Sequence, residues 1–382
     1  MAMHTNDMIV LNPQLDLDHP DDLDTQTVVA CGHIGPLLAE FGAGPADIVH
    51  LRVSYVNTGE VDEDVYRARV LELMPGLDGA VIDMVPFDRL VLPELLVEIC
   101  TYAMKAQDGH RLPRKAVTQD TLYAPERPLA HGLRVGSMVY TGLQSARSTD
   151  GAVLHAGDAP AQLAVLLDHL AATLDALGAD LADVVRLNLH YDVTLPDDAW
   201  QRCLRLLAER IPGGGPALTA IPLPRVFPDG CAINLCAWAM RGDDGTRLPM
   251  QRHPEGRTAP GPLLWRQTLV CEDMVFAGGL AALAADGTVA APGDHIAQTR
   301  GTLDAMEASL DACGTSLRDV HKTNSYYVLN TVQGFNDNLQ LRSDRFTKPG
   351  PASVGLPLDA LSLPGQSIEM EAISILDKDA PQ

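Results

Sequence analysis

The residues best able to do chemistry alternate along one predicted strand. In segment 183–193, Arg186, Asn188 and His190 alternate with apolar residues, and segments 47–57 and 319–329 repeat the pattern. Because side chains alternate between the two faces of a strand, these polar residues share one face. The full set is His50, Arg52, Ser54, Arg186, Asn188, His190, Lys322, Asn324 and Tyr326. Histidine titrates near neutral pH, which makes His190 the candidate proton carrier of the set.

Two interpretations of this polar set are open. If the apolar faces of the three strands pack on helices, the polar faces point toward one another. They could then line a polar cavity or channel that binds a substrate through Asn188, His190, Asn324 and Tyr326. Alternatively, they form a hydrogen-bonded network that locks three sheets together.

Several common catalytic motifs are absent from the sequence. There is no HExxH, Walker loop, GxSxG or GxGxxG, and no cysteine–histidine cluster with zinc spacing. The run Gly213–Gly215 is typical of a turn. We therefore predict neither a metal nor a cofactor.

Charge and cysteine usage limit the partners and the compartment. The formal net charge is −22, which opposes binding to nucleic acid or anionic lipid unless a basic patch is present, and none is found. No apolar run is long enough to span a membrane, and the first 20 residues do not have the pattern of a signal peptide. The 7 cysteines are scattered, which is typical of buried thiols in a reducing cytoplasm.

The elements that must position these residues recur along the chain at a fixed interval of about 136 residues. The interval links Asp22 with Asp158 and Asp294, and it links the residues at 26, 42 and 47 with their counterparts. A register kept over so many positions indicates three copies of one structural unit.

Each copy predicts the same order of elements. A helix begins at the repeated aspartate and ends at the repeated glycine, a suitable C′ residue. A strand, a second helix and two closing strands follow. The second helices are expected over Glu63–Leu73, Asp197–Arg210 and Asn336–Phe346, and the last two units open with strand pairs around 133–143 and 268–280. This alternation predicts α/β units, each a mixed sheet with helices on one face.

The predicted organisation is unit 1 over residues 1–104, a linker over 105–120, unit 2 over 121–240, a linker over 241–260 and unit 3 over 261–382. Unit 1 has only a short lead-in before its first helix. One strand fits there, near Met8–Leu11, but not a full hairpin.

The segments 127–144, 182–185, 216–220, 293–300 and 368–373 resemble the Rid family, the YjgF-type deaminases of reactive enamine and imine intermediates. The resemblance covers nearly the whole chain. It implies units of the chorismate-mutase-like type, which in Rid proteins form homotrimers with ligand sites in the clefts between subunits. Three units in one chain therefore predict an intramolecular pseudo-trimer, with further homo-oligomerisation open.

The sequence departs from the family at its site. The family's carboxylate-binding arginine is replaced by Ile82, Leu218 and Ser353. A tyrosine that often lines the site corresponds to Leu129 and Trp265. The late glutamate that contacts the attacking water is matched to Cys100, Cys236 and Glu371, so that unit 3 alone keeps it.

These matches predict a site in unit 3. Glu371 would activate water, backbone amides near Gly278 and Gly279 would hold the substrate, and Trp265 could stack on it. Each has a plainer interpretation: Glu371 on a solvent-facing or ion-paired strand, and Trp265 in packing. Arg225, which recurs as Arg89 in unit 1, could replace the missing arginine or only neutralise acidic neighbours.

The predicted function is hydrolysis or deamination of a small C=N or enamine substrate in an inter-unit cleft. Without the family arginine, simple 2-imino acids are expected to be poor substrates, and neutral, aromatic or amide-like molecules better ones. Two alternatives stay open: a non-catalytic small-molecule-binding or scaffold protein, and a remodelled cleft that hydrolyses another kind of bond.

Overall fold

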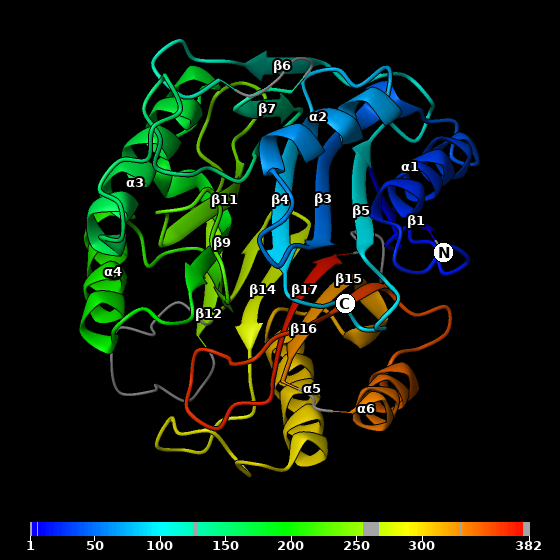
Figure 1. Cartoon of the computed structure of the whole chain (residues 1–382), viewed down its shortest axis with the longest axis vertical. Helices are drawn as coiled ribbons and strands as arrows, with labels where there is room; N and C mark the ends of the chain where they lie inside the picture. Colours follow the sequence, from blue (N-terminus) through cyan, green and yellow to red (C-terminus); the bar gives the residue numbers. More distant parts are fainter. Residues whose placement is uncertain (1, 6, 125–128, 255–266, 329–330, 377–382) are drawn as a thin grey trace.

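The computed structural model of the chain describes residues 2–5, 7–124, 129–254, 267–328 and 331–376. Three mixed sheets lie toward the centre, and three pairs of helices cover their outer faces (Figure 1). The predicted fold class, three α/β units in one chain, each a mixed sheet with helices on one face, is confirmed. No helix within the described ranges is long and apolar enough to cross a membrane.

The first unit has five strands and two helices. The strands are β1 Ala2–Thr5, β2 Met8–Leu11, β3 Ile48–Val56, β4 Val81–Phe87 and β5 Val97–Met104, and the helices are α1 Leu23–Ala39 and α2 Glu63–Leu73. The sheet order is β1-β2-β5-β3-β4, with β3 and β4 parallel. The strand predicted near Met8–Leu11 is present, but β1 pairs with it. The expectation that unit 1 lacks a hairpin is therefore wrong, because two four-residue strands fit into the short lead-in.

The second and third units each have six strands. Unit 2 comprises β6 Arg114–Val117, β7 Gly132–Val135, β8 Met138–Thr141, α3 Ala159–Ala176, β9 Val184–Asp192, α4 Asp197–Arg210, β10 Ala217–Leu223 and β11 Ile233–Met240. Unit 3 comprises β12 Met250–Pro254, β13 Gln267–Cys271, β14 Met274–Leu280, α5 His295–Ala312, β15 Val320–Tyr327, α6 Val332–Arg345, β16 Ala352–Pro357 and β17 Ile368–Ile375.

The segments predicted as linkers are partly sheet. Strand β6 lies within residues 105–120 and pairs with β7, and β12 lies within 241–260 and pairs with β13. Both segments are rich in glycine, proline and charge, which favoured loops, yet each adds an edge strand to the sheet of the following unit.

The repeated aspartate and glutamine have structural roles in every unit. Asp22, Asp158 and Asp294 each cap the first helix of their unit by accepting a hydrogen bond from a backbone N–H three residues on. The buried amide of Gln162 donates to Gly230 O and accepts from Ala232 N, and Gln26 and Gln298 make equivalent bonds. The glutamine therefore ties the first helix to the segment that leads into the last strand.

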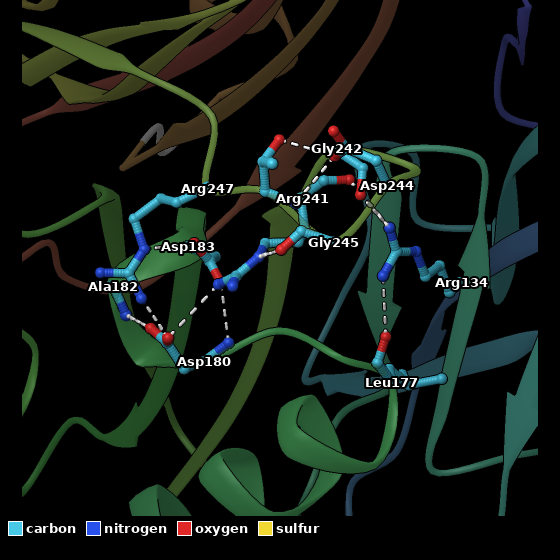
Figure 2. Close-up of polar contacts among 11 residues, drawn as sticks. Arg134, Leu177, Asp180, Ala182, Asp183, Arg241, Gly242, Asp244, Gly245 and Arg247 are labelled. Atoms are coloured by element: carbon cyan, nitrogen blue, oxygen red, sulfur yellow. Dashed lines mark hydrogen bonds and ion pairs between the residues drawn. The ribbon is translucent and has the colours of Figure 1, made fainter.

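The repeated segment that follows the closing strand forms ion pairs with the start of the middle strand (Figure 2). In unit 2, Arg241 and Arg247 reach Asp183 at 2.7 and 3.1 Å. Arg111, the counterpart of Arg247 in unit 1, lies 3.6 Å from Asp47. The similarity of the two tails in the sequence thus reflects one shared ion pair.

The three sheets pack against one another through a shared apolar core. Its centre is Trp238 of β11, fully buried, whose ring makes edge contacts with Tyr102, Tyr140 and Phe276. These rings come from all three units. A second cluster, around Phe87, Ile221 and Leu356, also joins all three units, so the chain forms two cores between units in addition to a core inside each unit.

The units also touch at their edges, where the opening hairpin of one approaches the closing strands of the previous one. Leu143 N donates to Ile82 O, and a Cβ on Gly142 would lie only 3.0 Å from that oxygen. Gly278 has the same relation to Leu218. The ring closes where Ser353 N donates to the side chain of Asn12 at 3.0 Å.

Candidate functional site

The polar set predicted from the middle strands meets at the centre of the molecule. Glu371 on β17 accepts hydrogen bonds from Arg186 at 2.7 Å and from Thr219 at 2.9 Å, both of unit 2. Asn188, Asn324 and Tyr326 also donate to its carboxylate. Despite burial, which raises it, Arg186, Asn324 and the charge of Arg52 lower the pKa of Glu371 to about 2. The carboxylate is therefore ionised and ion-paired at the centre.

The rest of this central network joins unit 1 to the other two. Arg52 donates to the Tyr326 hydroxyl at 2.8 Å. His50 accepts from the Trp238 indole at 3.0 Å and lies 2.9 Å from Asp83. Lys322 of unit 3 lies 3.5 Å from the Cys100 sulfur of unit 1. Because these side chains are 5% exposed or less, the contacts support the network interpretation over the open channel.

His190 does not have the environment of a proton carrier. Its side chain is buried, and burial together with the charge of Arg52 lowers its pKa to about 3. The imidazole therefore stays neutral at physiological pH. This corrects the expectation drawn from the usual histidine pKa, which holds for exposed rings.

A cleft lies elsewhere, between units 1 and 2, and has about 800 Å³ of empty space including its open mouth. Two positions at which the sequence departs from the Rid pattern, Ile82 and Leu129, line it together with Gly142. The cleft is therefore at the place where the resemblance puts a Rid ligand site. Its other lining residues include Glu63, Arg67 and Met84 of unit 1 and Leu122, Tyr123, His131, Leu143, Gln144, Arg147, His169, Phe227 and Asn234 of unit 2.

Glu63, the first residue of α2, places a carboxyl group on the wall of this cleft. The Tyr55 hydroxyl donates to Glu63 Oε2 at 3.0 Å, and the nearest Arg67 nitrogen lies 3.9 Å from Oε1. Burial raises the pKa of Glu63 to about 8, although Arg67, Tyr55 and Arg147 act in the opposite direction. At neutral pH this carboxyl group is protonated, so it can donate a proton.

Arg147, from the loop after β8, brings a guanidinium into the same cleft. Its side chain is 8% exposed and lies over the Tyr123 ring at 4.5 Å. It contacts Asp64 at 3.4 Å. In the described part of the chain, Arg147 Nε has no hydrogen-bond partner, and neither do the two amide atoms of Gln144.

The register of the last strand shows which glutamate position faces a cleft. Asn234 lines the cleft, and its counterpart in unit 3 is Glu369, whereas Cys236, the counterpart of Glu371, pairs with Asn188 toward the centre. Glu369 is buried against Gly279 and accepts from Gln366 at 3.0 Å. Of the two alternating glutamates, the one next to the predicted Gly278–Gly279 amides is therefore Glu369.

The other predicted site residues are dispersed. Arg225 is 41% exposed in its side chain and contacts Thr58 O and Asp229, away from Glu371. Arg89 pairs with Asp359 on the surface. Trp265 lies outside the described residues. The catalytic role of Glu371 remains a prediction, and its ion pair with Arg186 weighs against it.

Sequence reasoning missed Glu63 and Arg147. Glu63 follows the N-cap Asp62 of α2, where acidic residues are common for reasons of helix stability alone. Arg147 lies in a loop with no counterpart in a known motif. The sequence carried only an indirect signal. Ile82 and Leu129 replace two residues that line the site in the Rid family, and both line this cleft.

Comparisons with known proteins agree with this architecture. The sequence model of the family described as Endoribonuclease L-PSP matches residues 259–376. A chorismatase crystal structure is similar over 87% of this chain and 94% of its own, with 16% identity and a TM-score of 0.57.

Single Rid-type proteins match about one unit. A member of the YjgF/YER057c/UK114 family from Mycobacterium tuberculosis covers 34% of this chain and 100% of its own, at 21% identity and a TM-score of 0.29. RidA from an Antarctic Psychrobacter species covers 33% of this chain and 98% of its own, at 17% identity and a TM-score of 0.30.

Proposed function

Because the third unit belongs to the Endoribonuclease L-PSP family and the whole chain has the fold of a chorismatase, we propose that the protein is a small-molecule hydrolase of Rid type. Its site is the cleft between units 1 and 2. Its substrate contains a C=N bond or an enamine that tautomerises to one. The observation that carries the proposal is the carboxyl group of Glu63, which is buried on the wall of that cleft and accepts a hydrogen bond from Tyr55; burial raises its pKa to about 8.

Glu63 supplies the proton that such a hydrolysis needs. A C=N carbon accepts water readily once its nitrogen is protonated, and a carboxylic acid with a pKa near the working pH is a suitable donor. The Tyr55 hydroxyl, which donates to Glu63 Oε2 at 3.0 Å, holds the carboxyl group in place.

The proton balance closes with this one group. Glu63 protonates the imine nitrogen, water adds to the carbon, and the carboxylate then takes a proton from the added water. The same proton passes to the nitrogen, and as the C–N bond breaks the carboxylate takes the remaining hydroxyl proton, which gives a carbonyl compound and ammonia or an amine and restores protonated Glu63. No further reactant is needed.

A second candidate site is the corresponding boundary between units 2 and 3. Glu369 lies there beside Gly279, and Gly278 packs closely on the backbone of Leu218. Trp265, which was predicted to stack on the substrate, lies outside the described residues. At this site Glu369 would activate water, which is the role predicted for Glu371.

The test is an assay of ammonia release from a panel of imines and enamines, with and without an α-carboxylate, above the uncatalysed rate. Glu63→Gln keeps the size of the side chain but cannot donate and recover a proton. We expect it to lower kcat by about 100-fold or more. Glu72→Gln, on the exposed face of the same helix, should leave kcat unchanged.

The variants separate the alternatives. Loss of turnover in Glu369→Gln but not in Glu63→Gln would move the site to the boundary between units 2 and 3. Wild-type protein that binds members of the panel without turning any of them over would be a binding protein of this fold.

A further inference from the structure

The polar side chains that surround Glu371 at the centre of the molecule, here called the central polar layer, include a guanidinium without an anionic partner. Arg52 of β3 is 5% exposed and donates from Nη1 to the Tyr326 hydroxyl at 2.8 Å. Among the residues that the structure describes, Arg52 Nε and Nη2 have no hydrogen-bond partner. A buried guanidinium with unused N–H groups is costly, so Arg52 favours a further acceptor beside it.

Two more side chains with unused hydrogen-bonding groups lie close to Arg52. Ser54 and His190 occupy the positions on β3 and β9 that Tyr326 occupies on β15, and both are 1% exposed. Within the described part of the chain, Ser54 Oγ and both ring nitrogens of His190 have no partner. Burial and the charge of Arg52 lower the pKa of His190 to about 3, so the ring is neutral and has one N–H to donate.

Positive charge exceeds negative charge in this layer at neutral pH. The cationic side chains are Arg52, Arg186 and Lys322. Glu371 and Asp83 keep pKa values of about 2 despite burial, because neighbouring charges and hydrogen bonds stabilise both carboxylates. Each of them is already engaged, Glu371 by Arg186 at 2.7 Å and Asp83 by His50 at 2.9 Å. Burial raises the pKa of Glu98 to about 7, so its carboxyl group carries only part of a charge.

Apolar side chains of all three units border the layer and limit the size of an occupant. Val85, Ile221 and Leu356 are the strand partners of Ser54, His190 and Tyr326, and they belong to one buried cluster. On the other side, the Arg186 guanidinium lies 5.1 Å from the centre of the buried Trp238 ring. These side chains shield the layer from solvent, which suits a small ion and not an organic molecule.

We infer that Arg52, Ser54 and His190 bind a small monovalent anion, of the size of chloride, at the centre of the molecule. The anion accepts hydrogen bonds from the unused Arg52 nitrogens, from the Ser54 hydroxyl and from the His190 ring. It neutralises the surplus charge of the layer and contacts residues of units 1 and 2 at once. The site is separate from the cleft between those units and requires no turnover.

The first test compares thermal unfolding in sodium chloride and in sodium gluconate at equal ionic strength. Gluconate is too large for a buried site, so it controls for general screening of charge. An anion that binds only the folded chain raises its Tm, and we expect a rise of about 2 °C or more when chloride increases from about 5 to about 100 mM at the expense of gluconate.

Four variants locate the effect. Arg52→Met should abolish the chloride-dependent rise in Tm, and Arg52→Lys should retain part of it, because lysine keeps the charge but loses the planar fork. Ser54→Ala removes one donor and should reduce the rise, and it keeps the test available if the Arg52 variants do not fold. Arg89→Gln changes an exposed arginine and should behave as the wild type does.

The second test places the ion directly. Crystals of the whole chain grown with bromide in place of chloride should show an anomalous peak within hydrogen-bond distance of Arg52 and His190. A peak there, together with a chloride effect that Arg52→Met or Ser54→Ala weakens, supports the inference. An equal Tm in chloride and gluconate, an effect that Arg52→Met leaves intact, or only water at this position overturns it.

Discussion

Two buried glutamates of this chain, Glu371 and Glu63, lie in opposite electrostatic environments. Glu371 at the centre accepts hydrogen bonds from Arg186, Asn188, Thr219, Asn324 and Tyr326, and its pKa falls to about 2. Among the described residues, Glu63 accepts a hydrogen bond from the Tyr55 hydroxyl and lies 3.9 Å from the nearest Arg67 nitrogen, and burial raises its pKa to about 8.

The difference distinguishes a carboxylate with a structural role from a carboxyl group that can take part in a reaction. A carboxylate with all its donors in place is an ionised link between elements and has no proton to give at neutral pH. A carboxyl group that is buried at the edge of a cleft with few donors keeps its proton and can release it to a ligand. Burial of an acidic side chain does not by itself indicate catalysis. The hydrogen-bond donors around the carboxyl group decide whether it keeps a proton at neutral pH.

The largest expected effect is on the central side of this comparison. Glu371→Gln leaves Arg186 buried without its anion, and we expect a loss of about 3–5 kcal/mol in the free energy of unfolding. Denaturant titration at pH 7 measures it. Glu72→Gln, at an exposed position, should change stability by less than about 0.5 kcal/mol.

The pH dependence of stability sharpens the same point. Because the pKa of Glu371 is lower in the folded chain than its usual value, its contribution is present at neutral pH and is lost as the pH falls toward about 2. That loss should be missing from Glu371→Gln. A variant as stable as the wild type at pH 7 would mean that the central ion pair does not hold the units together.

The next effect is on the cleft side. If protonated Glu63 is the proton donor, wild-type kcat should be level near neutral pH and fall about tenfold per unit above pH 8. Measuring kcat from pH 6 to pH 10 on the best substrate of the panel tests this. A level profile through pH 10, with the protein still folded, would exclude Glu63 as the donor.

The smallest effect comes from the partner of Glu63. The Tyr55 hydroxyl stabilises the Glu63 carboxylate, so Tyr55→Phe should raise the Glu63 pKa further. The basic limb of the kcat profile should then move upward by less than about one pH unit. A downward shift would show that Tyr55 does not act on Glu63 as a hydrogen-bond donor.

The fold was largely predictable because the repeat constrains it three times. The capping aspartates, the buried glutamines and the glycines after the first helices recur in register, and each has the same local role in every unit. The errors lie at the edges of the sheets. The hairpin before Asp22 and the edge strands β6 and β12 depend on pairing with a neighbouring strand, which composition does not reveal.

The sequence predicted the location of the site but not the residues that give it its chemistry. The resemblance pointed to clefts between units, and Ile82 and Leu129 line one of them. The residues that give this cleft its chemistry come from a helix of one unit and a loop of the next. Their proximity depends on how the units pack against one another. The sequence pattern of each unit gives no information on that packing.

The contact between Ser353 and Asn12, which joins the last unit to the first, has a consequence for how such a molecule changes over time. In a ring of three separate identical subunits, assembly depends on concentration, and each substitution appears at three places at once. Here the ring stays assembled at any dilution, and each substitution appears once. Cys100, Cys236 and Glu371 occupy equivalent positions with different partners, so one position can acquire a charge while its counterparts remain apolar. Joining the units thus lets three equivalent positions become three different ones.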